Sequence, residues 1–378
     1  MRSIPAEGAT ASLWRLELLL SLLAVNTTSS DWAGQRRAMQ LVIERMLGEA
    51  PDLKVERSTP SGLPWAIIST PGLGRRLAFV CHIDTVPTGD LALWSVQPHR
   101  PEVRDGRIYG RGATDMKGGL VAAAAALLEA AAIGVPCSLV LTSDEEIGSL
   151  GAGTVAPMLQ GRGIAAVIVP EPTDNVVVAG HRGVLWLRIS ARGIAAHGSM
   201  PSLGRNAITT LMRVLSRAEA ELPLRETVAF GRETVAFGRE TMNIGVVAGG
   251  EAANVVPAEA HAIVDIRTIE PDNSQLHAWW SGQPEVDEVE TLLDLSPIPW
   301  SGDDPWVSAL PGPHQARPAP YFTDGSALAP ALSGVPTVIW GPGRAEQMHA
   351  ADEYVLRDSI EGAFHLYEQT IRRWDSRS

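Results

Sequence analysis

Three short apolar runs that lead into acidic or imidazole side chains constrain the fold of this chain most strongly. They cover residues 77–84, 137–143 and 164–172 and read LAFVCHID, CSLVLTS and IAAVIVPEP. Continuous apolar runs of this length are typical of strands that are buried on both faces of a parallel sheet. Residues 118–132, between the first two runs, are rich in Ala and Leu, which have high intrinsic helix preference. This alternation predicts a doubly wound, mostly parallel α/β sheet.

The sequence changes character after residue 179, where apolar and polar residues begin to alternate. Such alternation is typical of strands with one face in water, as in antiparallel sheets. The expected strands of this part are 184–193, 242–250, 259–269 and 285–295, and its expected helices are 205–222 and 273–282. Two helices on a four-stranded antiparallel sheet would form an α+β module inserted into the first domain.

The length of 378 residues exceeds what one hydrophobic core usually holds, so two domains are expected. The tail of the chain returns to α/β character. The remaining expected elements are helices at 13–25, 35–50 and 355–374 and a strand within 336–343. We therefore predict one domain formed by residues 1–179 and 297–378, and a second domain inserted at 180–296.

Charge and cysteine content narrow the functional class. The net charge of −12, without a basic stripe to offset it, argues against nucleic-acid binding. Cys81 and Cys137 are the only cysteines and form no CxxC motif, which fits a reducing cytoplasm. The apolar stretch 13–25 is interrupted by Arg15 and Glu17 and is too short to span a bilayer. We therefore expect a cytoplasmic protein with no targeting segment and no membrane partner.

One stretch of the chain is an exact tandem repeat. Residues 225–241 read RETVAFGRETVAFGRET, with a period of seven residues. Two copies are too few for a solenoid. We interpret the stretch as a duplication in a surface connection, where added length costs little entropy, and assign it no function.

Acidic and histidine side chains are found where several expected strands end or turn into a helix. The candidates are His82, Asp84, Asp115, Glu145, Glu146, Glu171 and His349. Each has an ordinary alternative: Asp115 could cap a helix, and His349 could be a surface loop residue. Together, however, most lie at the carboxyl edge of the sheet, where open α/β sheets bind ligands. Five carboxylates in one small space would repel one another, and a divalent cation would resolve that conflict.

The local spacing supports this interpretation. Residues i and i+2 of a strand share a face, so Asp84 can influence the surroundings of His82. A metal-bound imidazole normally has its second nitrogen held by a carboxylate or carbonyl. Glu145 and Glu146 face different directions, so one could bind metal while the other acts on water as a base. The sequence contains no HExxH, no GxSxG and no GKS or GKT ending, which excludes one-helix zinc peptidases, common serine hydrolases and phosphate loops.

These residues and the motifs around them resemble one known family. It is the co-catalytic metallopeptidase family of acetylornithine deacetylases, succinyl-diaminopimelate desuccinylases, aminoacylases and glutamate carboxypeptidases. The motifs, in order, are CHIDTVP, YGRGATDMKGG, TSDEEIGS, EPT, AAHGSMP, ANVVPAEAHAIVDIRT and MHAADEYV. The resemblance extends over about residues 13–370 and implies two divalent metal ions, with Zn²⁺ favoured and Co²⁺ or Mn²⁺ as alternatives.

The resemblance also implies the ligands of the ions. His82, Asp115 and Glu171 would hold one ion. Asp115, Glu146 and His349 would hold the other, so that Asp115 bridges. A water shared by the two ions would have a pKa lowered towards neutrality, ready to attack an amide carbonyl.

Further roles follow from the same resemblance. Glu145 would be the general base that accepts a proton from the attacking water, and Asp84 would act on His82. His197 resembles a histidine of the inserted domain that assists the oxyanion. Arg267 and Asn254 match positions that commonly hold the substrate carboxylate, although Arg267 could instead form an ordinary salt bridge on the sheet. Gly325 resembles a glycine of a substrate loop, and a cis peptide bond is expected after Asp115.

We therefore expect a two-zinc amidohydrolase that deacylates an N-acyl amino acid similar to N-acetylornithine, as in arginine biosynthesis. The segments TDGSALAP and IWGPGRAEQMHAADEYV favour the deacetylase branch over the desuccinylase branch. Residues 1–179 and 297–378 would form the catalytic domain, and 180–296 a lid and homodimerisation domain. Alternatives are a desuccinylase, a carboxypeptidase or dipeptidase with the same site, and a metal-free binding protein that retains the fold.

Overall fold

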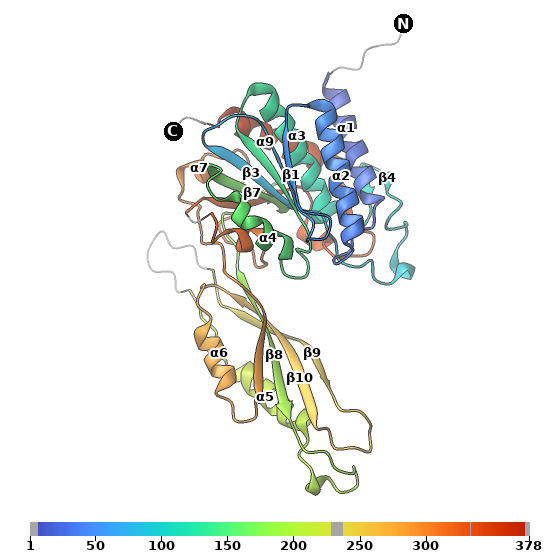
Figure 1. The fold of residues 1–378 in the computed structure, drawn as a ribbon, viewed down its shortest axis with the longest axis vertical. Helices are drawn as coiled ribbons and strands as arrows, with labels where there is room; N and C mark the ends of the chain where they lie inside the picture. The colour runs from blue at the N-terminus through green and yellow to red at the C-terminus, as the bar shows by residue number, and fades with distance from the viewer. Residues whose placement is uncertain (1–6, 228–236, 333, 375–378) are drawn as a thin grey trace. The chain divides into compact units, whose positions relative to one another are not determined.

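The computed structural model describes residues 7–227, 237–332 and 334–374. The chain forms two compact units (Figure 1). The first consists of Met1–Gly180, Pro299–Ala316 and Thr323–Ser378, and the second of His181–Ile298 and Arg317–Phe322.

The short segment Arg317–Phe322 corrects the expected division, which placed it in the first domain. The amide of Arg182 donates to the carbonyl of Ala319 at 3.1 Å, and the Phe322 ring meets the edge of Trp186. These contacts tie the segment to the second unit. A piece this short has no hydrophobic period that the sequence could reveal.

A six-stranded sheet forms the centre of the first unit, with the strand order β1-β2-β6-β3-β7-β12. Four strands are parallel: β3 (Arg76–His82), β6 (Cys137–Thr142), β7 (Ile164–Pro172) and β12 (Thr337–Gly341). The hairpin of β1 (Lys54–Arg57) and β2 (Ala66–Ser69) adds an antiparallel edge that the sequence did not predict. Each of these two strands has only four residues, too few for a clear pattern.

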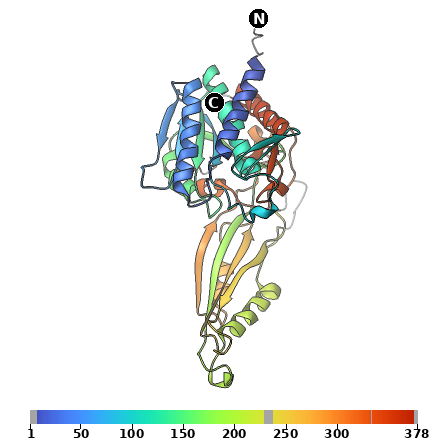
Figure 2. The same cartoon turned by 90° about the vertical axis from the view of Figure 1, so that its right-hand side faces the viewer.

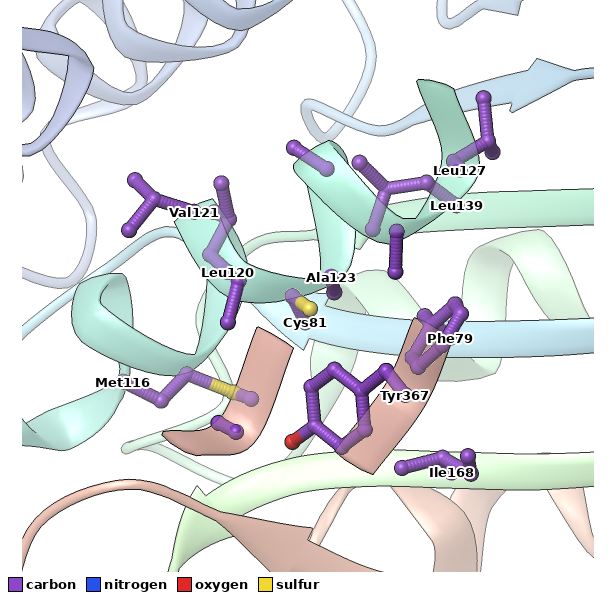
Figure 3. Close-up of a cluster of buried hydrophobic side chains, with 14 of the residues drawn as sticks. Phe79, Cys81, Met116, Leu120, Val121, Ala123, Leu127, Leu139, Ile168 and Tyr367 are labelled. Atoms are coloured by element: carbon purple, nitrogen blue, oxygen red, sulfur yellow. The ribbon is translucent and has the colours of Figure 1, made fainter. Parts of the chain in front are cut away.

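Helices cover both faces of this sheet. They are α1 (Glu7–Leu23), α2 (Trp32–Glu49), α3 (Gly118–Ile133), α4 (Leu150–Leu159), α7 (Pro305–Ser308), α8 (Asp324–Leu328) and α9 (Arg357–Arg372). Phe79 and Cys81 of β3 pack with α3 and α9 on one face, where Figure 3 shows them beside Leu120 and Tyr367. The alternate side chains of β3, such as Val80, pack with α4 and α8 on the other face.

Helix α3 is strongly apolar. By length and composition, residues Ala113–Ile133 are apolar enough to cross a membrane. However, 72% of the apolar 18-residue stretch within them is buried inside the protein. Burial on this scale is what a central core helix shows, because its apolar surface is already covered by β3, β7 and α9.

A small three-stranded sheet joins two distant parts of the first unit. Its order is β13-β5-β4, where β4 is Glu102–Arg104, β5 is Arg107–Tyr109 and β13 is Tyr354–Leu356. The pairing of β5 with β13 brings the turn before α3 next to the loop before β13. The remaining short turns are η1 (Leu91–Leu93), η2 (Ala113–Lys117), η3 (Pro201–Leu203) and η4 (Ala345–Gln347).

The second unit is a four-stranded antiparallel sheet with two helices on one face (Figure 2). The strand order is β11-β8-β10-β9, from β8 (Gly183–Arg192), β9 (Thr241–Gly249), β10 (Glu259–Thr268) and β11 (Glu288–Leu295). The helices are α5 (Ala207–Glu221) and α6 (Ser274–Ser281). The centre of the tandem repeat, residues 228–236, lies outside the described residues.

Candidate metal centre

The carboxyl ends of three parallel strands and the turn before α3 carry the candidate residues. His82 is the last residue of β3, Glu171 is the last but one of β7, and Glu145 follows β6 by three residues. Gly119 explains part of the glycine-rich motif at the start of α3, because a Cβ there would lie 2.1 Å from the carbonyl oxygen of Pro170. Glycine therefore allows α3 to approach the end of β7, which brings Asp115 close to Glu171.

The first group of possible metal ligands is buried. His82 Nε2 lies 3.1 Å from Asp115 Oδ1 and 3.5 Å from Glu171 Oε1. One ligand atom from each of the three residues lies within 4.8 Å of the others. A histidine nitrogen and two carboxylate oxygens are a donor set suited to Zn²⁺ and to similar divalent ions.

The second group shares Asp115 with the first. His349 Nε2 lies 3.3 Å from Asp115 Oδ2 and 3.0 Å from Glu146 Oε2. These ligand atoms also lie within 4.8 Å of one another. Asp115 thus presents Oδ1 to His82 and Oδ2 to His349, so one carboxylate stands between the two groups. The His349 side chain is 53% exposed, which leaves this side of the centre open to solvent.

The electrostatics of the centre favour a bound cation. Burial raises the pKa of Glu171 well above its usual range, and the nearby Asp115 carboxylate raises it further. Hydrogen bonds to Asp115 and Glu146 raise the pKa of His349 to about 10. Burial lowers the pKa of His82, but Glu171, Asp115 and Asp84 together raise it well above its ordinary value. A divalent cation would relieve the repulsion of such crowded carboxylates and become the largest local charge.

Asp84 organises the backbone around the centre. His82 Nδ1 lies 3.1 Å from the main-chain carbonyl of Asp84 and 3.5 Å from its carboxylate. The same carboxylate accepts hydrogen bonds from the amides of Glu145 at 3.1 Å and Glu146 at 3.3 Å. Ser29 donates a further hydrogen bond to it at 2.8 Å. Asp84 therefore orients His82 and also fixes the turn that carries both glutamates, which the spacing alone did not predict.

Glu145 belongs to neither ligand group. Its side chain is 7% exposed, and burial raises its pKa well above the usual range, with the Asp324 and Glu146 carboxylates raising it further. Asp324 is itself buried and accepts a hydrogen bond from Thr142. A carboxylate beside the two groups, but outside them, is free to exchange a proton with water.

Glu353 is a residue of this centre that the sequence did not single out. Its carboxylate accepts hydrogen bonds from the amides of Gly112 and Thr114 at 2.9 Å and of Asp115 at 3.1 Å. Arg111 pairs with it at 2.9 Å and also donates to the carbonyl of Ala350. Glu353 thus fixes the backbone of the bridging residue and anchors the loop that carries His349. Only its place in the motif MHAADEYV, four residues after His349, could have indicated this role.

We expect Glu353→Gln to weaken metal binding. An amide cannot accept from all these donors, and its NH₂ group would face backbone N–H groups, so the Asp115 turn would shift. Loss of such a supporting carboxylate typically lowers metal affinity about 10–100-fold. Titration of the metal-free variant with Zn²⁺ measures this change. Glu346→Gln, an exposed substitution in the same loop, is the matched control. Wild-type affinity in Glu353→Gln would contradict the positioning role.

The remaining candidates have varied surroundings. Gly325 lies buried in the first turn of α8, where its amide donates to Thr323 Oγ1 at 3.2 Å. His197 is exposed in the second unit, with Nδ1 2.8 Å from Ser199 Oγ. Asn254, also in that unit, is exposed as well. The substrate roles of these three residues remain predictions.

Arg267 forms the salt bridge that was its alternative interpretation. Its Nη2 lies 2.9 Å from Asp265 Oδ2 on the same strand, and its guanidinium stands 5.4 Å from the centre of the Phe322 ring. Its side chain is still 26% exposed. The pair uses only part of the five N–H donors of an arginine, so a role for Arg267 towards a substrate carboxylate also stays a prediction.

The peptide bond between Asp115 and Met116 is cis, as the motif resemblance implied.

Gly112, in the same turn, has a φ of 83°, and a Cβ there would lie 2.7 Å from the Thr85 side chain. This glycine is therefore required both by the backbone conformation and by the close approach of the strand-end loop after β3.

Comparison with known proteins agrees with the geometry of the centre. The family model described as Peptidase family M20/M25/M40 matches residues 78–373. The chain is 31% identical over 349 residues to a succinyl-diaminopimelate desuccinylase from Paracidovorax citrulli, covering 83% of this chain and 85% of that protein. It is 31% identical over 309 residues to an acetylornithine deacetylase from Myxococcus xanthus, covering 75% and 76%.

The fold is similar to that of an M20 family metallo-carboxypeptidase from Sulfolobus solfataricus, with a TM-score of 0.80 and 18% identity. The similarity covers 95% of this chain and 98% of that one. It extends over both units of the chain.

Proposed function

Because this chain belongs to peptidase family M20/M25/M40 and is a metal-dependent hydrolase, we propose that it removes the acyl group from an N-acyl amino acid similar to N-acetylornithine. The observation that carries the proposal is the pair of ligand groups that share Asp115, with Glu145 close enough to interact electrostatically with His82, Glu146 and Glu171. A buried cluster of this kind is suited to holding two divalent ions close together.

The distances between the side chains support two ligand sets. His82, Asp115 and Glu171 would hold one ion, and Asp115, Glu146 and His349 the other. When bound, such ions supply Lewis acidity towards an amide carbonyl and lower the pKa of water. Zn²⁺ is favoured by the mixture of nitrogen and oxygen donors, while Co²⁺ and Mn²⁺ fit the same donors.

The side chains around the ligands perform the proton transfers. Glu145 accepts the proton of the attacking water and returns it to the leaving amine. Its burial helps, because a carboxylate with a raised pKa is a stronger base. Asp84 keeps Glu145 in place through its backbone amide and keeps the His82 ring oriented. Both supports are set before substrate arrives, so little reorganisation is needed during the reaction.

Two other substrate classes are alternatives to the N-acetyl amino acid. The desuccinylase relative is as similar to this chain as the deacetylase relative, and the solved neighbour is a carboxypeptidase. We favour the deacetylase because of the segments TDGSALAP and IWGPGRAEQMHAADEYV, the first of which includes Gly325 in α8. Arg267, Asn254 and His197 would contact the substrate from the second unit, and two copies of the chain would pair through that unit in the cytoplasm.

A substrate panel tests the proposal. We expect acetate release from N-acetylornithine with kcat/KM at least about tenfold above succinate release from N-succinyl-diaminopimelate or dipeptide hydrolysis, since one pocket difference is worth about 1–3 kcal/mol. A chelator should abolish turnover, and added Zn²⁺ should restore it. Turnover that survives chelation would refute the metal centre. A faster reaction on either competing substrate would replace the substrate assignment and leave the centre intact.

A further inference from the structure

A cavity of the first unit lies between α2 and the β1–β2 hairpin. Its volume is about 460 Å³, within the range of small-molecule pockets. Its lining is made of arginines and apolar side chains, with few other polar groups. The lining residues are Arg36, Arg37, Met39, Gln40, Ile43, Arg57, Ser58, Pro60, Trp65 and Ala66. We call this cavity the arginine groove; none of its residues is a candidate metal ligand.

The three arginines of the groove form no ion pair with a carboxylate within 4.0 Å in the described part of the chain. Arg36 donates to Ser58 Oγ at 3.0 Å and to the carbonyl of Gly62, and Arg57 donates to Gln40 Oε1 at 2.9 Å. These partners are neutral. Most guanidinium N–H groups of the set are therefore left for another acceptor, because each arginine carries five.

The neighbouring arginines differ from those of the groove. Arg45, further along α2, pairs with Glu17 at 2.8 Å. Glu56, the residue before Arg57 in β1, is paired with Arg162 at 2.6 Å. Glu44 of α2 accepts a hydrogen bond from Gln40 at 2.8 Å and forms no ion pair with a groove arginine, so three unpaired positive charges gather in a chain whose net charge is −12. An anion in the groove would relieve their repulsion.

The floor of the groove is apolar. Met39 and Ile43 are 4% and 5% exposed, and Ala66 is fully buried. Trp65 is half-buried and also lines the cavity. Inorganic phosphate would use the arginines alone, whereas an aromatic or aliphatic body would also cover this floor.

We propose that the arginine groove binds a small organic anion. Its phosphate or carboxylate group is held by Arg37 and Arg57, and its aromatic or aliphatic body packs on Trp65 and Met39. Arg36 supports the wall through its bonds to Ser58 and Gly62. The site is independent of the hydrolase reaction, because its residues lie on α2 and the β1–β2 hairpin rather than at the carboxyl ends of the parallel strands.

Titration calorimetry with phenyl phosphate and with benzoate tests the proposal on the metal-loaded protein. The double variant Arg37→Gln/Arg57→Gln removes two donors and leaves Arg36 in place. Its matched control is Arg45→Gln/Arg104→Gln, which has the same change in net charge at exposed ion pairs outside the groove. We expect at least one of the two aromatic anions to bind at least about tenfold more weakly to the groove variant than to the control, since each charge-assisted hydrogen bond is worth about 1.5–3 kcal/mol.

Inorganic phosphate is the second arm of the experiment. We expect it to bind at least about tenfold more weakly than phenyl phosphate, because it leaves the apolar floor uncovered. Equal affinity of the groove variant and the control for both aromatic anions would overturn the proposal, since any binding would then be at the metal centre or non-specific. Phosphate binding as tight as that of phenyl phosphate would also overturn it. Hydrolase activity of both double variants verifies that they are folded.

Discussion

Glu145→Gln should slow hydrolysis about 10³-fold while leaving the metal content unchanged. The amide has nearly the same shape, so the hydrogen bond between its backbone N–H and Asp84 is kept. It cannot accept a proton, however, and general-base catalysis of this kind contributes about 10²–10⁴-fold. We therefore expect kcat to fall by about 10³-fold, with little change in KM. Steady-state kinetics and metal analysis of the same preparation measure both quantities.

Glu146 provides the comparison variant for Glu145→Gln. Glu146→Gln is the same chemical change one position along, but Glu146 lies 3.0 Å from His349 Nε2 in the second ligand group. It should therefore lose metal as well as activity. If Glu145→Gln keeps a kcat close to that of the wild type, Glu145 is not the base. If it loses metal as Glu146→Gln does, Glu145 is a ligand and the proposed division of roles is wrong.

Asp115→Asn should have the broadest effect on the centre. Asp115 is the one residue shared by both ligand groups, with a separate oxygen directed at each histidine. An amide has one acceptor oxygen and no charge, so both ion sites lose a ligand atom or a negative charge. We expect weakened binding of both ions. A loss of about 4 kcal/mol of transition-state stabilisation would lower kcat/KM by about 10³-fold.

Asp105→Asn is the matched control for this prediction. Asp105 is exposed in the turn between β4 and β5 and has a φ of 49°, a conformation that Asn also tolerates. Metal analysis and kinetics of the two variants should therefore differ sharply. Two tightly bound ions in Asp115→Asn would contradict the bridging position, whereas one retained ion would show which ligand group can hold metal without it.

The convergence of the strand-end residues could be predicted because it follows from sheet geometry. His82 and Glu171 end parallel strands that are neighbours, and Glu145 and Glu146 follow the next one. Carboxyl ends of parallel strands meet at one edge, so these side chains must be close. Asp115 was also predictable, because a glycine-flanked helix start returns to the same edge.

Other parts of the centre carry no such local signal. His349 sits in a loop with a φ of 62°, and only the motif around it indicated a role. Glu353 looks like an ordinary acidic residue before a strand, yet it accepts four hydrogen bonds from the Asp115 turn and Arg111. Its role depends on pairing between β5 and β13, two three-residue strands that are more than two hundred positions apart. Hydrophobic periodicity predicts single helices and strands and gives no information on which distant strands pair.

The arginine groove could not be predicted from the sequence, for a similar reason. Its cations come from α2 and from β1, a strand too short to be recognised. Arg36 and Arg37 are adjacent in the chain, but Arg57 joins them only when the hairpin packs beside the helix. The three guanidinium groups therefore line one cavity only in the folded protein.

The hydrogen bonds by which Glu353 fixes the Asp115 turn have a consequence for the order in which the metal centre of a newly made chain is assembled. Every ligand of the first group has been synthesised once the chain reaches residue 171, whereas His349 and Glu353 are added more than 170 residues later. The growing polypeptide thus carries four of the five candidate ligands long before His349 is added. His349 and Glu353 are made just before β13, so the second ligand group and its support can form only after this distant part of the chain has been synthesised.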